Sequence, residues 1–231
     1  MKKSDVGKRS DSKNQLVLFD IDGTLTKGIA LHYEAFCYAV HKLTRKSIEN
    51  NDRDYIGWLD KAILSDLLGK DVSAKQIDEA IRLTGLFYQE HVGSDDLVLL
   101  PHVYDLLSAL KKKGIFLGIV SGNVKKIANA KLNNLGIDGF FQIGAFGSER
   151  MNRKDLIPMA IQRAKKKTGK PFDRIVLVGD TPLDIRAARM NNIPVIAVSH
   201  GYYDASDLAD ADLLVNDFGD IKKIVEFIEN G

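Results

Sequence analysis

Two carboxylates close together follow the first apolar segment of the chain. Gln15-Leu-Val-Leu-Phe-Asp20 is a short run rich in strand-forming residues, and it continues into Ile21-Asp22-Gly23. Two carboxylates buried side by side repel each other and lose hydration, unless a cation compensates or one of them takes a proton. Asp20 and Asp22 therefore indicate a site that binds a cation or transfers a proton. A simple turn after the strand is the plainer alternative.

Two more polar clusters follow later apolar segments. Ser121-Gly122-Asn123 supplies a small hydroxyl and a flexible backbone ahead of a predicted helix, which suits the oxygens of a phosphate. Gly179-Asp180-Thr-Pro-Leu-Asp184 follows another apolar run, and its two aspartates, four residues apart, can face one point. Each residue also has an ordinary role open to it, as a helix cap or as an acid in the first turn of a helix.

The elements that carry these clusters alternate between strand and helix patterns. Short apolar runs predict six strands, at Gln15–Asp20, Ile115–Val120, 142–146, Ile175–Val178, Val195–Val198 and Leu213–Val215. Helical stripes lie between and after them, at 103–110, 123–135, 155–168, 182–191 and 218–229. This order predicts the α/β class, a three-layer Rossmann-like parallel sheet core with helices on both faces. In such sheets ligands bind at the carboxyl ends of the strands, so the three clusters are expected to meet there.

One long segment interrupts the alternation. More than 90 residues separate the first and second strands, and apolar residues within them recur at helical spacing with no strand pattern. We predict an inserted all-helical cap domain at 27–97. The catalytic core then comprises 15–26 and 98–231, and the polar residues 1–14 form a disordered leader.

Composition excludes several classes of protein. The chain has 231 residues and a net charge of +2. Residues 1–14 alone hold a surplus of three positive charges, so the rest of the chain has a net charge of −1. It therefore lacks the basic stripe that is typical of a nucleic-acid binder. The single cysteine, Cys37, excludes an internal disulfide framework, and its place on an apolar stripe indicates inert packing. No apolar run is long enough to span a bilayer or to act as a secretory signal, so we expect a cytoplasmic protein with no membrane partner. The histidines show no metal-ligand spacing and are assigned to the surface or to ordinary packing: His32, His41, His91, His102 and His200.

The convergence of four carboxylates favours a hard divalent cation as cofactor. Mg²⁺ prefers oxygen ligands and suits a site that also holds phosphate. We expect Asp20, Asp22, Asp180 and Asp184 to form its metal site.

The motifs together resemble one family. LVLFDIDGTLT, then VSGN, then a basic residue before GDTPLD are similar to the haloacid dehalogenase-like (HAD) superfamily of aspartyl-phosphate hydrolases. The resemblance extends over about 15–230. It includes the helical insert, which matches the cap of the phosphoglycolate phosphatase and beta-phosphoglucomutase-like branch.

The resemblance implies a role for each motif residue. Asp20 would be the nucleophile, and Asp22 the general acid and then the base, with its backbone carbonyl also helping to hold Mg²⁺. Asp180 would be the remaining metal ligand, and Asp184 would support it. The phosphoryl group and the first loop would be held by Ser121, Gly122, Asn123 and Thr24.

A cation that pairs with the nucleophile is also implied. Many relatives have a Lys-Pro pair here, whereas this chain has Glu149-Arg-Met-Asn-Arg153-Lys154-Asp155. We favour Arg153 narrowly over Lys154, with Arg150 third. In the cap, the resemblance makes Gly57, Trp58 and Lys61 candidates for substrate binding, and packing between cap and core is the alternative role.

The function expected from these features is a Mg²⁺-dependent phosphatase. Its substrate would be a small phosphorylated metabolite such as phosphoglycolate or a sugar phosphate, and the enzyme would be a monomer or weak homodimer. A phosphomutase of the beta-phosphoglucomutase type would use the same core residues and remains open. A phosphonate hydrolase with an imine-forming lysine near Lys61 matches the cap less well. The intact Asp22 argues against a dehalogenase, and the full set of carboxylates argues against a non-enzymatic scaffold.

Overall fold

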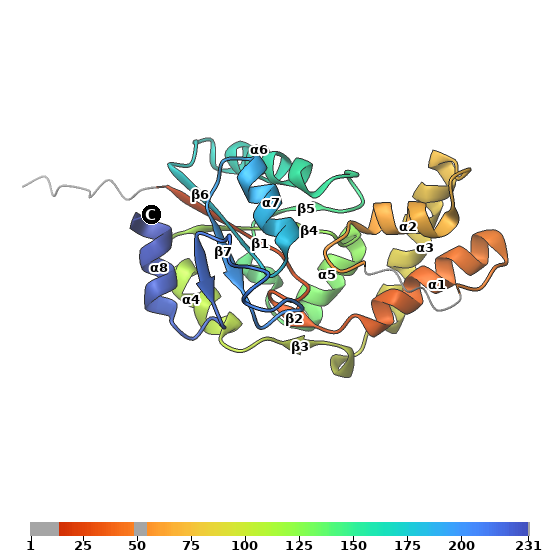
Figure 1. The fold of residues 1–231 in the computed structure, drawn as a ribbon, viewed down its shortest axis with the longest axis horizontal. Helices are drawn as coiled ribbons and strands as arrows, with labels where there is room; N and C mark the ends of the chain where they lie inside the picture. Colours follow the sequence, from red (N-terminus) through yellow and green to blue (C-terminus); the bar gives the residue numbers. More distant parts are fainter. Residues whose placement is uncertain (1–13, 49–54, 231) are drawn as a thin grey trace, which may run out of the picture.

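The computed structural model describes residues 14–48 and 55–230. Its centre is a parallel six-stranded sheet in the order β5-β4-β1-β6-β7-β8 (Figure 1). The strands are β1 (Gln15–Phe19), β4 (Phe116–Ser121), β5 (Ile143–Phe146), β6 (Arg174–Gly179), β7 (Val195–Val198) and β8 (Leu213–Val215). All six predicted strands are thus present, with ends that differ by no more than one residue.

Helices cover both faces of the sheet. Alternate residues of each strand point to opposite faces, so Val17 and Phe19 join one apolar cluster and Leu16 and Leu18 the other. The first cluster includes side chains of α4 (Val103–Lys112), α5 (Lys125–Asn134) and α8 (Ile221–Asn230). The second includes those of α6 (Leu156–Thr168) and α7 (Pro182–Met190). These three layers confirm the predicted α/β fold.

The strand order reverses at β1, which pairs with β4 on one side and with β6 on the other. Asp20 directly follows β1, Ser121 is the last residue of β4, and Asp180 directly follows β6. The three polar clusters therefore lie at the ends of neighbouring strands, where an open parallel sheet binds its ligands.

Between β1 and α4, the described residues form three α-helices, which lie at one end of the molecule (Figure 1). They are α1 (Ala30–Thr44), α2 (Asp60–Leu68) and α3 (Ala74–His91), and they enclose an apolar cluster of their own around Phe36, Ile63 and Leu64. Short 3-10 turns lie at η1 (Ser94–Asp96), η2 (Asp138–Phe140) and η3 (Arg153–Asp155). This separate small core supports our proposal that 27–97 is a cap.

Strand structure reaches the edge of the proposed cap, which the sequence did not indicate. β2 (Thr26–Lys27) pairs antiparallel with β3 (Val98–Leu99), so the two connections between sheet and helices form a two-residue ribbon. The expectation of no strand in 27–97 is wrong for Lys27, because two residues are too few to show a period. At the other end of the chain, the Asn14 backbone N–H donates to Asp173 Oδ2 at 2.7 Å, and residues 1–13 of the predicted leader lie outside the described residues.

Within the described residues, none of the helices combines the length and the apolar character that crossing a bilayer requires.

Candidate active site

Three buried aspartates meet at the carboxyl edge of the sheet. Ligand oxygens of Asp20, Asp180 and Asp184 all lie within 4.8 Å of one another. The Thr24 hydroxyl donates to Asp180 Oδ1 at 2.8 Å, which ties the loop after β1 to the end of β6. Gly23 has φ +79, and a Cβ there would lie 2.0 Å from Asp180 Oδ2, so this position requires glycine both for its backbone and for space.

Burial of this acidic group makes its charge costly. Desolvation, together with the nearby charges of Asp184 and Asp22, raises the pKa of Asp20 to about 7, although Arg153 opposes the shift. Burial and the same crowding raise the pKa of Asp180 well above its ordinary value. Three desolvated carboxylates that share one small space are a donor set for a hard cation, so the residues fit a divalent metal ion such as Mg²⁺.

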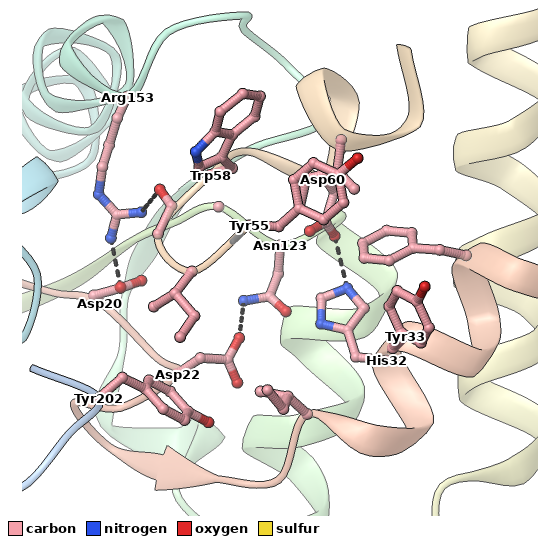
Figure 2. A pocket seen from close by; sticks show the side chains of 16 residues that line it. Asp20, Asp22, His32, Tyr33, Tyr55, Trp58, Asp60, Asn123, Arg153 and Tyr202 are labelled. Atoms are coloured by element: carbon pink, nitrogen blue, oxygen red, sulfur yellow. Dashed lines mark hydrogen bonds and ion pairs between the residues drawn. The ribbon is translucent and has the colours of Figure 1, made fainter. Parts of the chain in front are cut away.

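Arg153 is the cation that reaches the predicted nucleophile. Its guanidinium pairs with Asp20 Oδ2 (Figure 2). Its Nε donates to Asp184 Oδ1 at 2.7 Å. The other carboxylate oxygen of Asp184 accepts the Thr181 hydroxyl at 2.7 Å within the capping box that starts α7. Asp184 therefore links the start of α7 to Arg153.

The other two basic candidates point elsewhere. Lys154 is exposed on η3, and Arg150 donates to the neighbouring Glu149 carbonyl at 2.8 Å. The sequence favoured Arg153 only narrowly over Lys154 as the cation beside Asp20. Of these two residues, Arg153 contacts Asp20 in this structure and Lys154 does not.

Ser121 and Asn123 connect the predicted phosphate loop to Asp22. Asn123 Nδ2 donates to Asp22 Oδ2 at 2.7 Å (Figure 2). It also donates to Ser121 Oγ at 2.6 Å. Ser121 is fully buried, and Asn123 is 3% exposed. The predicted phosphate loop and the predicted acid-base residue thus belong to one hydrogen-bonded unit.

A buried lysine that the sequence analysis missed holds the other oxygen of Asp22. Lys131, on α5, is completely buried, and its Nζ lies 2.5 Å from Asp22 Oδ1 and 3.0 Å from Asn123 Oδ1. Burial alone would raise the pKa of Asp22, but the Lys131 ammonium and the hydrogen bonds to Asp22 outweigh it and lower that pKa. Asp22 is therefore held as a carboxylate. The detectable signal was a lysine on the apolar face of its helix, next to Leu132 and four residues after Ile127.

This network continues into the cap. Lys131 Nζ lies 3.3 Å from His32 Nδ1. On the other side of the ring, His32 Nε2 lies 3.0 Å from Asp60 Oδ2 (Figure 2). Asp60 also accepts the backbone N–H of Val124 at 2.5 Å. We expected His32 to lie at the surface or in ordinary packing. Its ring does pack on Phe36 and Tyr88, at 4.7 and 5.8 Å between ring centroids, but the same ring also takes part in this polar network, which its sequence position does not indicate.

A cavity of about 320 Å³ opens between the core loops and the cap, with Asp20 and Asp22 in its wall. Gly57 and Trp58, both predicted to bind substrate, also line it, and Lys61 is not among its lining residues. A Cβ on Gly122 would lie 2.5 Å from the Trp58 carbonyl oxygen, and the Asp60 backbone N–H donates to the Gly122 carbonyl at 2.9 Å. The cap loop and the loop after β4 are therefore in backbone contact beside the cavity.

Known proteins resemble this chain in sequence and in fold. Residues 15–192 match the haloacid dehalogenase-like hydrolase family. The chain belongs to the haloacid dehalogenase-like hydrolases. Phosphoglycolate phosphatase from Salmonella typhimurium is 26% identical to it, over 89% of this chain and 90% of the relative.

Solved structures of two predicted phosphatases show the same fold. A predicted phosphatase from Clostridium acetobutylicum superposes with a TM-score of 0.70 at 22% identity, over 93% of this chain and 99% of that one. A predicted phosphoglycolate phosphatase from Haemophilus somnus gives a TM-score of 0.69 at 24% identity, over 94% of this chain and 100% of that one.

Family membership and the phosphatase relatives confirm the enzyme class expected from the sequence, a HAD-like phosphatase that hydrolyses phosphoric monoesters. The structure brings ligand oxygens of Asp20, Asp180 and Asp184 within 4.8 Å of one another and pairs Arg153 with Asp20 and Asp184. It also connects Asp22 to Ser121 through Asn123. It leaves Lys154 exposed.

Proposed function

We propose that this HAD-like hydrolase is a Mg²⁺-dependent phosphatase that acts on a small phosphomonoester through an aspartyl-phosphate on Asp20. The observation that carries the proposal is the convergence of three buried aspartates and Arg153 at the point where the strand order reverses. Such a site can neutralise an incoming phosphoryl group and present one carboxylate oxygen to its phosphorus.

In the first half of the reaction, a carboxylate oxygen of Asp20 attacks phosphorus and the bond to the substrate alcohol breaks. The Ser121 hydroxyl and the backbone amides of Gly122 and Asn123 hold the phosphoryl oxygens. Arg153 offsets the negative charge shared between nucleophile and phosphoryl group. Asp22 takes up a proton from solvent water as the negatively charged substrate binds, and it gives this proton to the departing alkoxide.

In the second half, Asp22 acts as the base. It removes a proton from a water molecule that attacks phosphorus, which releases phosphate and frees Asp20. Lys131 and Asn123 hold Asp22 in the ionised form that this step requires.

The carboxylates of Asp20 and Asp180 and the backbone carbonyl of Asp22 would hold Mg²⁺, with Asp184 in support. When bound, the ion neutralises charge that builds up on the phosphoryl oxygens. The helical cap would exclude bulk water from the cavity and contact the alcohol part of the substrate.

Hydrolysis of p-nitrophenyl phosphate tests this proposal. We expect turnover that requires Mg²⁺, is lost with EDTA, and falls by at least about 1,000-fold in Asp20→Asn. Asp105→Asn, an exposed carboxylate on α4, is the matched control and should retain wild-type activity. Metal-independent turnover, or turnover that survives Asp20→Asn, would contradict the proposal.

A further inference from the structure

The part of the cavity beyond the catalytic carboxylates is largely apolar. Its cap wall is formed by aromatic and branched aliphatic side chains, namely Ile29, Tyr33, Phe36, Tyr55, Ile56, Trp58 and Ile63. Tyr202 adds an aromatic ring from the loop after β7. Figure 2 shows the rings of Trp58, Tyr33 and Tyr202 coming from separate segments to surround the space near Asp20 and Asp22.

Several of these side chains are exposed in a way that large apolar groups usually are not. Trp58 is 45% exposed, Ile29 45% and Tyr33 38%. Trp58 packs edge-to-face on Tyr55 at 5.5 Å between ring centroids, which fixes the indole at the cavity wall. A concave apolar patch held in place beside reactive groups is suited to an apolar ligand group.

The charges around the cavity disfavour a second anionic group on the substrate. Among the described lining residues there are two basic side chains, Arg153 and His32. Arg153 pairs with Asp20 and Asp184, and His32 bonds with Asp60. A carboxylate or second phosphate on the substrate would thus find no uncommitted lining cation and would lie near acidic residues.

We infer that the alcohol part of the substrate is uncharged, with an apolar or aromatic body of about one ring or a short alkyl chain. This inference rests on the proposed function and narrows it. It disfavours phosphoglycolate as the substrate, because the glycolate that leaves in that reaction carries a carboxylate. Phosphoglycolate is the compound named in the curated relatives of this chain. It also disfavours a phosphomutase, since a sugar bisphosphate would bring a second phosphate into this cavity.

Paired substrates test the inference directly. The ratio of kcat/KM for phenyl phosphate to that for meta-carboxyphenyl phosphate isolates the effect of the second charge. A second pair, butyl phosphate and butyl phosphate with a carboxylate at the far end of its alkyl group, repeats the comparison with a poor leaving group. We expect the uncharged member to be favoured at least about tenfold in both pairs, and phosphoglycolate to be a poor substrate.

Variants then connect the preference to the cavity wall. Trp58→Ala should lower kcat/KM for phenyl phosphate about tenfold and should lower kcat/KM for methyl phosphate by a smaller factor. Trp58→Phe keeps an aromatic ring at this position and should retain most of the wild-type kcat/KM for phenyl phosphate. Tyr33→Lys should shift the phenyl to carboxyphenyl ratio at least tenfold toward the charged substrate. Tyr104→Ala, an exposed aromatic on α4 outside the cavity, is the control and should leave both ratios unchanged.

The outcomes separate the inference from the proposed function. Mg²⁺-dependent turnover in which the carboxylate substrates match or exceed the uncharged ones would overturn the inference and leave the phosphatase intact. Equal effects of Trp58→Ala on phenyl and methyl phosphate would also overturn it. If wild type hydrolyses none of these esters, the proposed function fails and the inference fails with it.

Discussion

Replacement of Lys131 by methionine tests the buried network that holds Asp22. Methionine keeps much of the length and apolar stem of the lysine side chain but removes the ammonium. That ammonium is within 3.3 Å of Asp22, Asn123 and His32, and it lies 5.6 Å from the Tyr88 ring centroid. Lys131→Met therefore leaves Asp22 Oδ1 without its cation.

The cost follows from burial. Removing one partner of a buried ion pair typically destabilises a protein by about 3–5 kcal/mol. The Asp22 side chain is 20% exposed, so water can partly replace Lys131 there, and we expect a loss of about 2–3 kcal/mol in the free energy of unfolding at pH 7. For a chain of this size that corresponds to a fall in Tm of roughly 5–10 °C.

The sign of the pH dependence is fixed by the lowered pKa of Asp22. A carboxylate with a lowered pKa contributes stability above its ordinary pKa, and that contribution is lost as the pH falls through the lowered value. The stability difference between wild type and Lys131→Met should therefore be largest near neutral pH. This difference in stability should shrink toward about pH 4 and below, because Asp22 becomes protonated in both proteins, and at a higher pH in the variant than in wild type.

Activity provides a second measurement. A displaced acid-base residue should lower kcat/KM by about 10- to 100-fold for an alkyl phosphate, and less for p-nitrophenyl phosphate, whose leaving group needs little protonation. Urea denaturation at several pH values and steady-state kinetics give both quantities. Lys125→Met, exposed on the same helix, is the control. If Lys131→Met changes stability by less than about 0.5 kcal/mol and both rates by less than about twofold, the role we assign to Lys131 is refuted.

Three further changes probe the rest of the site. Arg153→Met should lower kcat by about 100-fold and Lys154→Met by less than about twofold in steady-state kinetics, and equal losses would contradict the assignment of the cation. Because the pKa of Asp20 is raised to about 7, the metal-free protein should lose stability as pH rises from about 4 through 7. In thermal melts, Mg²⁺ should consequently raise Tm more at pH 8 than at pH 5, and an equal gain at both would count against the metal site. Gly122→Ala places a Cβ 2.5 Å from a cap-loop carbonyl and should cost about 1–3 kcal/mol in urea denaturation, whereas Gly139→Ala, with open space around it, should cost less than about 0.5. Similar costs for the two glycines would show that the cap loop can move away freely.

The positions of the main catalytic residues could be predicted because they depend on local signals. Runs of buried apolar residues define β1, β4 and β6, and a parallel sheet brings their carboxyl ends to one edge. Asp20, Ser121 and Asp180 follow those runs directly in the sequence. Their convergence therefore required no knowledge of individual side-chain contacts.

The residues that were missed depend on contacts between distant elements. Lys131 and His32 lie on helices that the apolar pattern predicts. The contact between their two side chains, however, depends on how α1 packs relative to α5, and the sequence pattern of neither helix shows that. The choice between Arg153 and Lys154 depends on the direction in which η3 turns each side chain, and adjacent basic residues give no signal for that. The β2–β3 ribbon is too short for any periodicity.

Identification of the phosphorylated residue tests directly whether Asp20 is the nucleophile. Wild-type protein is mixed with Mg²⁺ and an excess of phosphomonoester, quenched in acid within milliseconds and reduced with borohydride, which converts an aspartyl-phosphate to homoserine. Peptide mass spectrometry should then find homoserine in place of Asp20, only when substrate was present, and never in place of Asp22 or Asp180. Efficient Mg²⁺-dependent hydrolysis with no such product at Asp20, or with the modification at another residue, would contradict the central claim that Asp20 carries the phosphoryl group.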